Sequence, residues 1–128
     1  MKNNTLVHLG LAILRIVPSI FLMTHGYTKL IWLLNGTAEE NFKFSFLGIG
    51  QAPSLFLAVL GEFVCPLLMI IGFKTRWAAI PSAITMFVAA FVVHANDPFG
   101  VKEHALLFLT FFVIIFLLGP GKYSVDKN

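Results

Sequence analysis

Residues 52–73, APSLFLAVLGEFVCPLLMIIGF, decide the fold, because they form a long apolar run with a single charged residue, Glu62. About 20 apolar residues in a helix are enough to cross the hydrocarbon core of a bilayer. Pro53 suits the first turn of a helix, where a backbone N–H needs no partner within the helix. Gly72 and the basic residues that follow it close the run. The stretch therefore predicts a transmembrane helix with one acidic side chain in its interior.

Three more apolar segments predict further helices, one before this run and two after it. The first would be about 45 Å long as a helix, whereas the hydrocarbon core is about 30 Å thick, so it must tilt, bend at Pro18 or project from the membrane. Polar residues 35–51 are expected to form a loop, and turn signals at 96–98 and 119–121 end the last two helices. We predict an all-α protein, an antiparallel four-helix transmembrane bundle in one domain covering 1–128, with helices over residues 5–34, 52–73, 77–95 and 102–118.

The composition excludes several classes of protein. Hydrophobic residues make up 58% of the chain and charged residues 12%, so a water-soluble domain could not solvate its surface, and the expected solvent is lipid. The net charge of +3 comes without a basic cluster, which excludes a nucleic-acid-binding surface. Cys65 is the only cysteine, so an internal disulfide and a CxxC redox pair are excluded. Arg15 interrupts any signal-peptide core, so the first segment is expected to remain in the mature protein.

The distribution of basic residues predicts the orientation in the membrane. In a four-pass arrangement, lysines and arginines gather on one side, whereas the few on the opposite side are offset by acidic residues. Both termini are therefore expected in the cytoplasm, with Trp77 at the inner interface and Trp32 at the outer one. The basic residues on the cytoplasmic side are Lys2, Lys74, Arg76, Lys122 and Lys127, and the charged residues opposite are Glu39, Glu40, Lys43, Asp97, Lys102 and Glu103.

The polar residues among these helices occur in an order that resembles the DoxX family of small bacterial membrane proteins. The resemblance covers nearly the whole chain. Its pieces are Arg15 in the first helix, His25-Gly26-Tyr27-Thr28-Lys29, Leu60-Gly61-Glu62, Gly72-Phe73-Lys74-Thr75-Arg76, His94, Lys102-Glu103 and the ending GPGKYSVD at residues 119–126.

The resemblance implies a multi-pass protein of the bacterial cytoplasmic (inner) membrane. The family takes its name from a quinol oxidase and thiosulfate:quinone oxidoreductase context, and other members are linked to oxidoreductase complexes in oxidative-stress defence. It therefore implies a subunit of, or accessory to, a quinone-linked membrane oxidoreductase, with quinone and a larger membrane complex as partners. The alternative is a non-enzymatic docking subunit or a small-metabolite carrier. Nothing in the chain shows the inverted repeat that transporters use, which weakens the carrier alternative.

Arg15 and Glu62 are the two ionisable residues expected deepest in the membrane. Counted from the cytoplasmic ends of their helices, both would lie at a depth of about 15–18 Å. A lone charge at such depth costs at least about 2.5–3.5 kcal/mol, so we predict a buried ion pair between Arg15 and Glu62. Pro18 and Pro66 also leave backbone carbonyls unpaired nearby, which Arg15 could satisfy. The pair could only fix the register of the helices, or it could take part in proton transfer or quinone headgroup binding.

A second polar group is expected toward the outer face, where helices 5–34, 77–95 and 102–118 would converge on a pocket. On a helical wheel Lys29 shares the interior face with Arg15. Lysine and histidine can donate hydrogen bonds to quinone oxygens, and histidine exchanges protons near neutral pH. The candidate ligand- or quinone-binding residues are His25, Lys29, His94, Glu103 and His104.

Other interpretations of this second polar group, including purely structural ones, stay open. Glu103 in the first turn of a helix is favoured by the helix dipole, and a Lys29–Glu103 salt bridge would be purely structural. Haem or metal held by His25 and His94 is not favoured, because two histidines without a spaced third ligand are a weak metal signal. The sequence names no catalytic residue and leaves the cofactor open between quinone and none.

Overall fold

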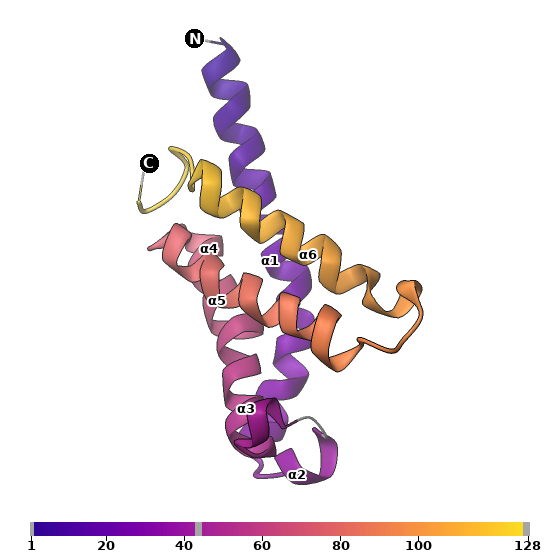
Figure 1. Cartoon of the computed structure of the whole chain (residues 1–128). Coiled ribbons are helices and arrows are strands. Elements are labelled where there is room, and N and C mark those ends of the chain that lie inside the picture. Colours follow the sequence, from indigo (N-terminus) through magenta and orange to yellow (C-terminus); the bar gives the residue numbers. More distant parts are fainter. Residues whose placement is uncertain (1, 43–44, 127–128) are drawn as a thin grey trace.

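The computed structural model describes residues 2–42 and 45–126, and every regular element within them is helical. This confirms the all-α class. Figure 1 shows one long helix, α1, beside a second, broken helix, with an α5–α6 hairpin crossing them at a slant. The elements are α1 (Lys2–Leu34), α2 (Ala38–Asn41), the 3-10 turn η1 (Phe46–Gly48), α3 (Gln51–Val59), the π-helical turn η2 (Leu60–Val64), α4 (Cys65–Ile71), α5 (Thr75–Val88), the π-helical turn η3 (Ala89–Val93) and α6 (Phe99–Leu118).

The apolar helices fit a membrane environment. Among the described residues, three segments are long and apolar enough to cross a bilayer: Asn4–Leu34, Gln51–Ile71 and Thr75–Val93. Their outward faces carry large exposed side chains such as Phe56 and Phe87, each 51% exposed, which is the reverse of a water-soluble surface. The fourth predicted span corresponds to α6, and a four-span antiparallel bundle stays a prediction.

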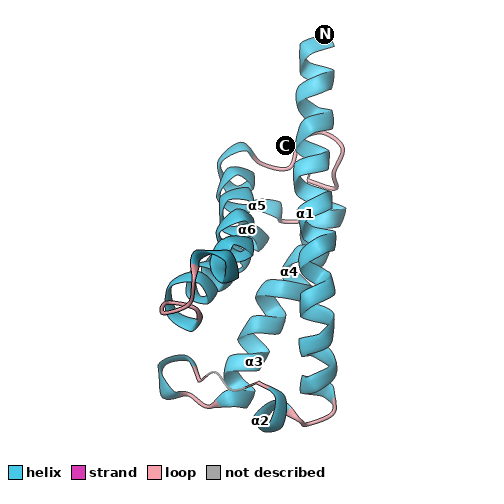
Figure 2. Ribbon diagram, turned by 90° about the vertical axis from the view of Figure 1, so that its right-hand side faces the viewer, coloured by secondary structure: helices cyan, strands magenta, loops and turns pink. Residues whose placement is uncertain are grey.

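The helices pack around two clusters of buried apolar residues. The larger cluster joins α1, α4, α5 and α6 through Leu22, Met69, Ala79 and Phe112, among others. The smaller one, of Ala38, Leu55 and Val59, lies where α2 meets α3. Figure 2 shows the α5–α6 hairpin slanting away from α1 and α3 toward the end that carries α2. The segment 35–51, expected to be a loop, contains the short helices α2 and η1, and Lys43 lies outside the described residues, as does Lys127.

The first turns of α1 extend beyond the other helices, and both termini lie at the same end of the molecule (Figure 1). Leu6 and Val7, on these turns, are 66% and 58% exposed. An added Cβ on Gly10 would find no atom within 4 Å, so the face of α1 at Gly10 is open. This arrangement is compatible with projection from the membrane, one of the three alternatives that the length of α1 leaves open.

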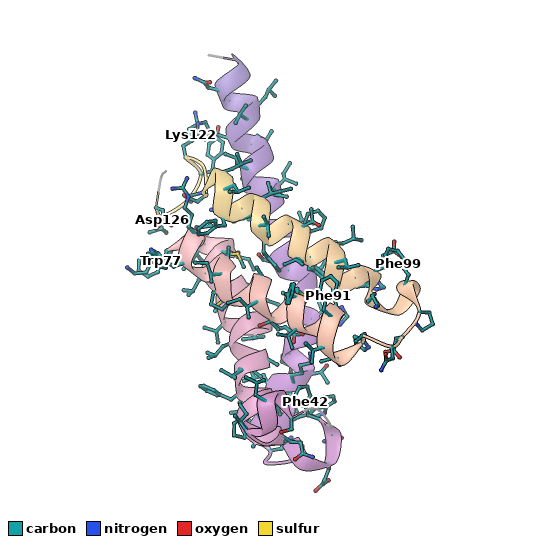
Figure 3. The ribbon with its side chains drawn as sticks, in the orientation of Figure 1. Phe42, Trp77, Phe91, Phe99, Lys122 and Asp126 are labelled. Carbon is teal, nitrogen blue, oxygen red and sulfur yellow. The ribbon has the colours of Figure 1, made fainter. Side chains whose placement is uncertain are left out.

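The tail after α6 folds back over the turn between α4 and α5. The N–H groups of Val125 and Asp126 donate to the carbonyls of Ile71 and Gly72, at 3.2 and 2.9 Å. The Asp126 carboxylate accepts from the backbone N–H of Lys74 at 2.9 Å and of Thr75 at 2.8 Å. Asp126 thus caps the start of α5 from the far end of the chain, close to Trp77 in Figure 3.

We expect Asp126→Asn to lower the free energy of unfolding by about 1 kcal/mol at pH 7, the usual scale for a helix cap. Burial disfavours the charged carboxylate, but hydrogen bonds from the N–H groups of Thr75 and Lys74 outweigh this and hold the pKa of Asp126 below its ordinary value. A depressed pKa gives stability that is present above the unfolded-state pKa, about 3.9, and lost as the pH falls through the folded-state value. Thermal unfolding in detergent should therefore show the gap between wild type and variant closing in acid. A gap of constant size at every pH would contradict this role.

Candidate functional site

The buried carboxylate of the second span pairs with Lys29. The Lys29 Nζ lies 2.6 Å from Glu62 Oε2, and the two side chains are 26% and 5% exposed. The predicted Arg15–Glu62 ion pair is therefore wrong in its basic partner. The Lys29 Nζ also lies over the face of the Phe42 ring, 5.9 Å from its centre.

Close backbone contact brings this pair together. Gly26 of α1 lies against the backbone of Glu62, where an added Cβ would overlap the Glu62 carbonyl. Lys29 is one turn further along α1 on the same face, so its side chain reaches the carboxylate. On the other side of η2, an added Cβ on Gly61 would collide with Thr85, and the Ser82 hydroxyl donates to the Gly61 carbonyl at 2.6 Å. Two glycines thus hold Glu62 between α1 and α5.

Arg15 lies at a different depth from the Lys29–Glu62 pair, and it binds the C-terminal tail. Its Nη2 donates to the Tyr123 carbonyl at 2.7 Å, and the side chain is 1% exposed. Its Nη1 lies beside Gly72, at the end of α4. Arg15 precedes Gly26 by about 16 Å along the helix, at 1.5 Å per residue. The depth estimate failed because it assumed that α1 enters the membrane near Thr5, whereas the first turns of α1 project and shift Arg15 toward the α4–α5 turn.

Two cavities meet at the Lys29–Glu62 pair. We call the first the histidine cavity; it has a volume of about 390 Å³ and is lined by Leu22, Thr24, His25, Thr28, Lys29, Trp32, Glu62, Met86, Ala89, His94, His104, Ala105 and Phe108. We call the second the α3–α5 groove; it has a volume of about 320 Å³ and is lined by Lys29, Phe42, Ser54, Leu57, Ala58, Leu60, Glu62, Pro81, Ile84, Thr85, Val88, Ala89, Val93 and His94.

Four of the five candidate binding residues line the histidine cavity: His25, Lys29, His94 and His104. Glu103 lines neither cavity and is exposed, so the structure does not bring it to the site. The Lys29–Glu103 salt bridge considered from sequence is not formed, because Lys29 is bound to Glu62. Glu62 was predicted as a framework residue, and the structure makes it a wall of both cavities.

His94 is positioned by a residue that the sequence reasoning did not assign to the site. Its Nδ1 lies 2.7 Å from the Asp97 carboxylate, which leaves Nε2 as the ring nitrogen for another partner. Asp97 was interpreted as part of a turn signal and as one of the charges on the outer side, although its spacing of three residues from His94 could have indicated the contact. His94 directly follows the π-helical turn η3, as Glu62 lies within η2. Such turns frequently occur at functional sites.

The donor set suits an organic ligand. Within residues 2–42 and 45–126, no three side chains of the His, Cys, Asp and Glu types lie close enough together to hold a metal ion. The histidine cavity instead offers one ammonium, three imidazoles and the aromatic faces of Trp32 and Phe108. Such a wall can donate hydrogen bonds to carbonyl or hydroxyl oxygens and contact the faces of a flat ring.

Known proteins support the membrane assignment. The family model for DoxX matches residues 10–95 of the chain. Inner membrane protein YqjF of Escherichia coli (strain K12) is 32% identical, over 92% of this chain and 90% of the relative. An uncharacterized protein of Haemophilus influenzae is 24% identical, over 98% of this chain and 89% of the relative. No solved structure matches the chain. The family match covers more than half of the sequence, and it includes Arg15, Lys29, Glu62 and His94, so the chain belongs to the DoxX family of membrane proteins.

Proposed function

We propose that this protein binds the headgroup of a membrane quinone in the histidine cavity, as a subunit of or accessory to a quinone-linked oxidoreductase of the bacterial inner membrane. The observation that carries the proposal is the cavity at the Lys29–Glu62 pair, with His94 on its wall. A quinone ring is flat and apolar, with an oxygen at each end, which matches aromatic walls interrupted by a few hydrogen-bond donors.

The cavity supplies those donors from different helices. Lys29 comes from α1 and keeps two N–H groups beyond the one that Glu62 accepts. His94 follows η3, and Asp97 orients its ring. His25 and His104 are on α1 and α6, so a bound headgroup would contact donors on three sides. Histidine can also take up or release a proton near neutral pH, which quinone chemistry requires.

We extend the proposal to the membrane topology, with four spans and both termini in the cytoplasm. The α4–α5 turn, with Lys74 and Arg76, lies at the same end of the molecule as both termini (Figure 1). This end carries the excess of basic residues that marks the cytoplasmic side. Lys29 is near the C-terminal end of its span, and His94 directly follows the C-terminal end of another. In this topology both ends are on the side away from the cytoplasm, so the two cavities lie in that half of the membrane.

The accessory alternative is favoured by the projecting start of α1. Its exposed Leu6, Val7 and Leu9 give a larger complex an apolar surface to pack on. Both readings accommodate the cavity, because a quinone-binding subunit need not hold the other redox centres of its complex.

The quinone proposal is tested by fluorescence, because the chain has two tryptophans and, of these, Trp32 lines the histidine cavity whereas Trp77 lines neither of the two cavities described above. We expect a benzoquinone with one isoprenoid unit to quench Trp32 saturably in nanodiscs made from the Trp77→Phe variant. His94→Ala should weaken the binding about tenfold, the equivalent of one lost hydrogen bond of about 1.4 kcal/mol. Glu103→Gln, beside the cavity but not on its wall, should change nothing.

Non-specific partitioning of the quinone into lipid is measured with the Trp32→Phe variant. This variant keeps only Trp77, which is 73% exposed and lies near the start of α5 (Figure 3). Quenching of Trp77 should rise linearly with quinone without saturation. If Trp32 shows the same linear dependence, the headgroup does not bind in the histidine cavity and the proposal fails.

A further inference from the structure

The α3–α5 groove has mostly apolar walls, and the two hydroxyl groups that line it already donate hydrogen bonds within the protein. Leu57, Leu60, Ile84 and Val88 are among the apolar residues that line it. The Ser54 hydroxyl donates to the Gly50 carbonyl at 2.6 Å, and the Thr85 hydroxyl donates to the Pro81 carbonyl at 2.8 Å. Both hydroxyls are thus turned to the backbone of their own helices. Both hydroxyls would therefore keep their hydrogen bonds if a hydrocarbon chain filled the groove.

One end of the groove is the polar site itself. The groove and the histidine cavity share four residues, Lys29, Glu62, Ala89 and His94. An occupant of both cavities would need a polar head at the Lys29–Glu62 pair and an apolar chain leading away from it. The two cavities together therefore describe an amphipathic ligand.

The outer side of the groove opens on the surface that faces lipid. Leu57 and Ile84 line it and are 44% and 57% exposed, and they lie in the two segments Gln51–Ile71 and Thr75–Val93 that can cross a membrane. The lining residues come from α3, η2 and α5, among others, and the α5–α6 hairpin diverges from α1 and α3 in Figure 2. A ligand dissolved in the bilayer could therefore enter sideways.

We propose that the α3–α5 groove holds the apolar tail of the ligand whose headgroup binds in the histidine cavity, and that this ligand enters laterally from the bilayer. The inference rests on the proposed function, and it adds the position of the hydrocarbon tail and the route by which the quinone enters. Lipid chains are as apolar as the groove, so transfer from lipid into the groove gives no hydrophobic gain. What selects the tail over a free lipid chain is its attachment to a held headgroup, which raises its effective concentration at the groove.

The test uses a quinone that carries a photoreactive diazirine on a decyl tail, in nanodiscs with the wild-type protein. Cross-links mapped by mass spectrometry should gather at residues 57–60 and 84–88 and disappear when excess tailless quinone is added. The variant Leu57→Trp should reduce these cross-links several-fold by filling the groove. Leu67→Trp is the matched control, because Leu67 is on the same span, is 45% exposed and lines neither cavity.

Binding of the tailless quinone, measured by calorimetry, reports on the headgroup site alone and should survive in Leu57→Trp. If the tailless quinone binds but the cross-links spread evenly over outward residues such as Phe116, the tail does not occupy the groove. If a phospholipid with a diazirine on its acyl chain labels the groove and quinone does not displace it, the groove is a lipid site. Absence of calorimetric binding by the wild type overturns the headgroup proposal, and the tail inference with it.

Discussion

Lys29→Met is expected to lower the free energy of unfolding by about 3 kcal/mol, because it leaves Glu62 charged, buried and without its partner. The Glu62 side chain is only 5% exposed, so water replaces only part of what the ammonium 2.6 Å away supplies. Methionine keeps most of the length of the lysine side chain, so the loss reports on charge more than on packing. Thermal unfolding in detergent micelles would measure the effect.

The double variant Lys29→Met/Glu62→Gln should recover most of this loss, because removing both charges removes the uncompensated one. Glu103→Gln is a control with a similar change of charge at an exposed residue, and it should alter stability by less than about 0.5 kcal/mol. If the double variant were as unstable as the single one, the two side chains would not act as a pair.

Gly26→Ala is expected to destabilise the protein by at least about 2 kcal/mol and to separate Lys29 from Glu62, because its new methyl group would overlap the Glu62 carbonyl. The neighbour is backbone within a helical span, so no side-chain rotation can relieve the contact. The same displacement should weaken quinone binding, which the quenching of Trp32 would report.

Gly10→Ala provides the matched control on the same helix. A Cβ at Gly10 meets no atom within 4 Å, and alanine has the better helix propensity, so stability should stay constant or rise slightly. Equal effects of the two substitutions would show that glycine at position 26 matters only for the flexibility of α1. A loss confined to Gly26→Ala would support close contact between α1 and η2.

The membrane character of the fold could be predicted because it depends on long apolar runs. Four apolar segments of spanning length and few charges indicate a chain surrounded by lipid. Backbone N–H and C=O groups in lipid must be paired within the protein, which a helix achieves by itself, so the helical class and the membrane assignment could both be predicted. The π-helical turns η2 and η3 were not predicted. Pro66, which cannot donate to the Glu62 carbonyl, follows η2 and was a local signal for a break there, but it does not specify a π turn.

The candidate site was predicted in part. Burial cost correctly indicated that Glu62 needs a basic partner, but two residues on the same face of α1, Arg15 and Lys29, could fill that role. Choosing between them requires the relative depth of the two spans. That depth is set by Gly26 packing on η2 and by the projecting first turns of α1, neither of which residue counting includes.

The hydrogen bond between Arg15 and the Tyr123 carbonyl joins residues 108 positions apart. At a translation rate of about 5–20 residues per second, Tyr123 leaves the ribosome roughly 5–20 s after Arg15. During this interval the first span is already in the membrane with its guanidinium lacking the acceptor that it has in the finished protein. The nascent protein must therefore pass through a period in which Arg15 is held by water, lipid phosphate or the insertion machinery, and a chain that stops short of Tyr123 never leaves that state.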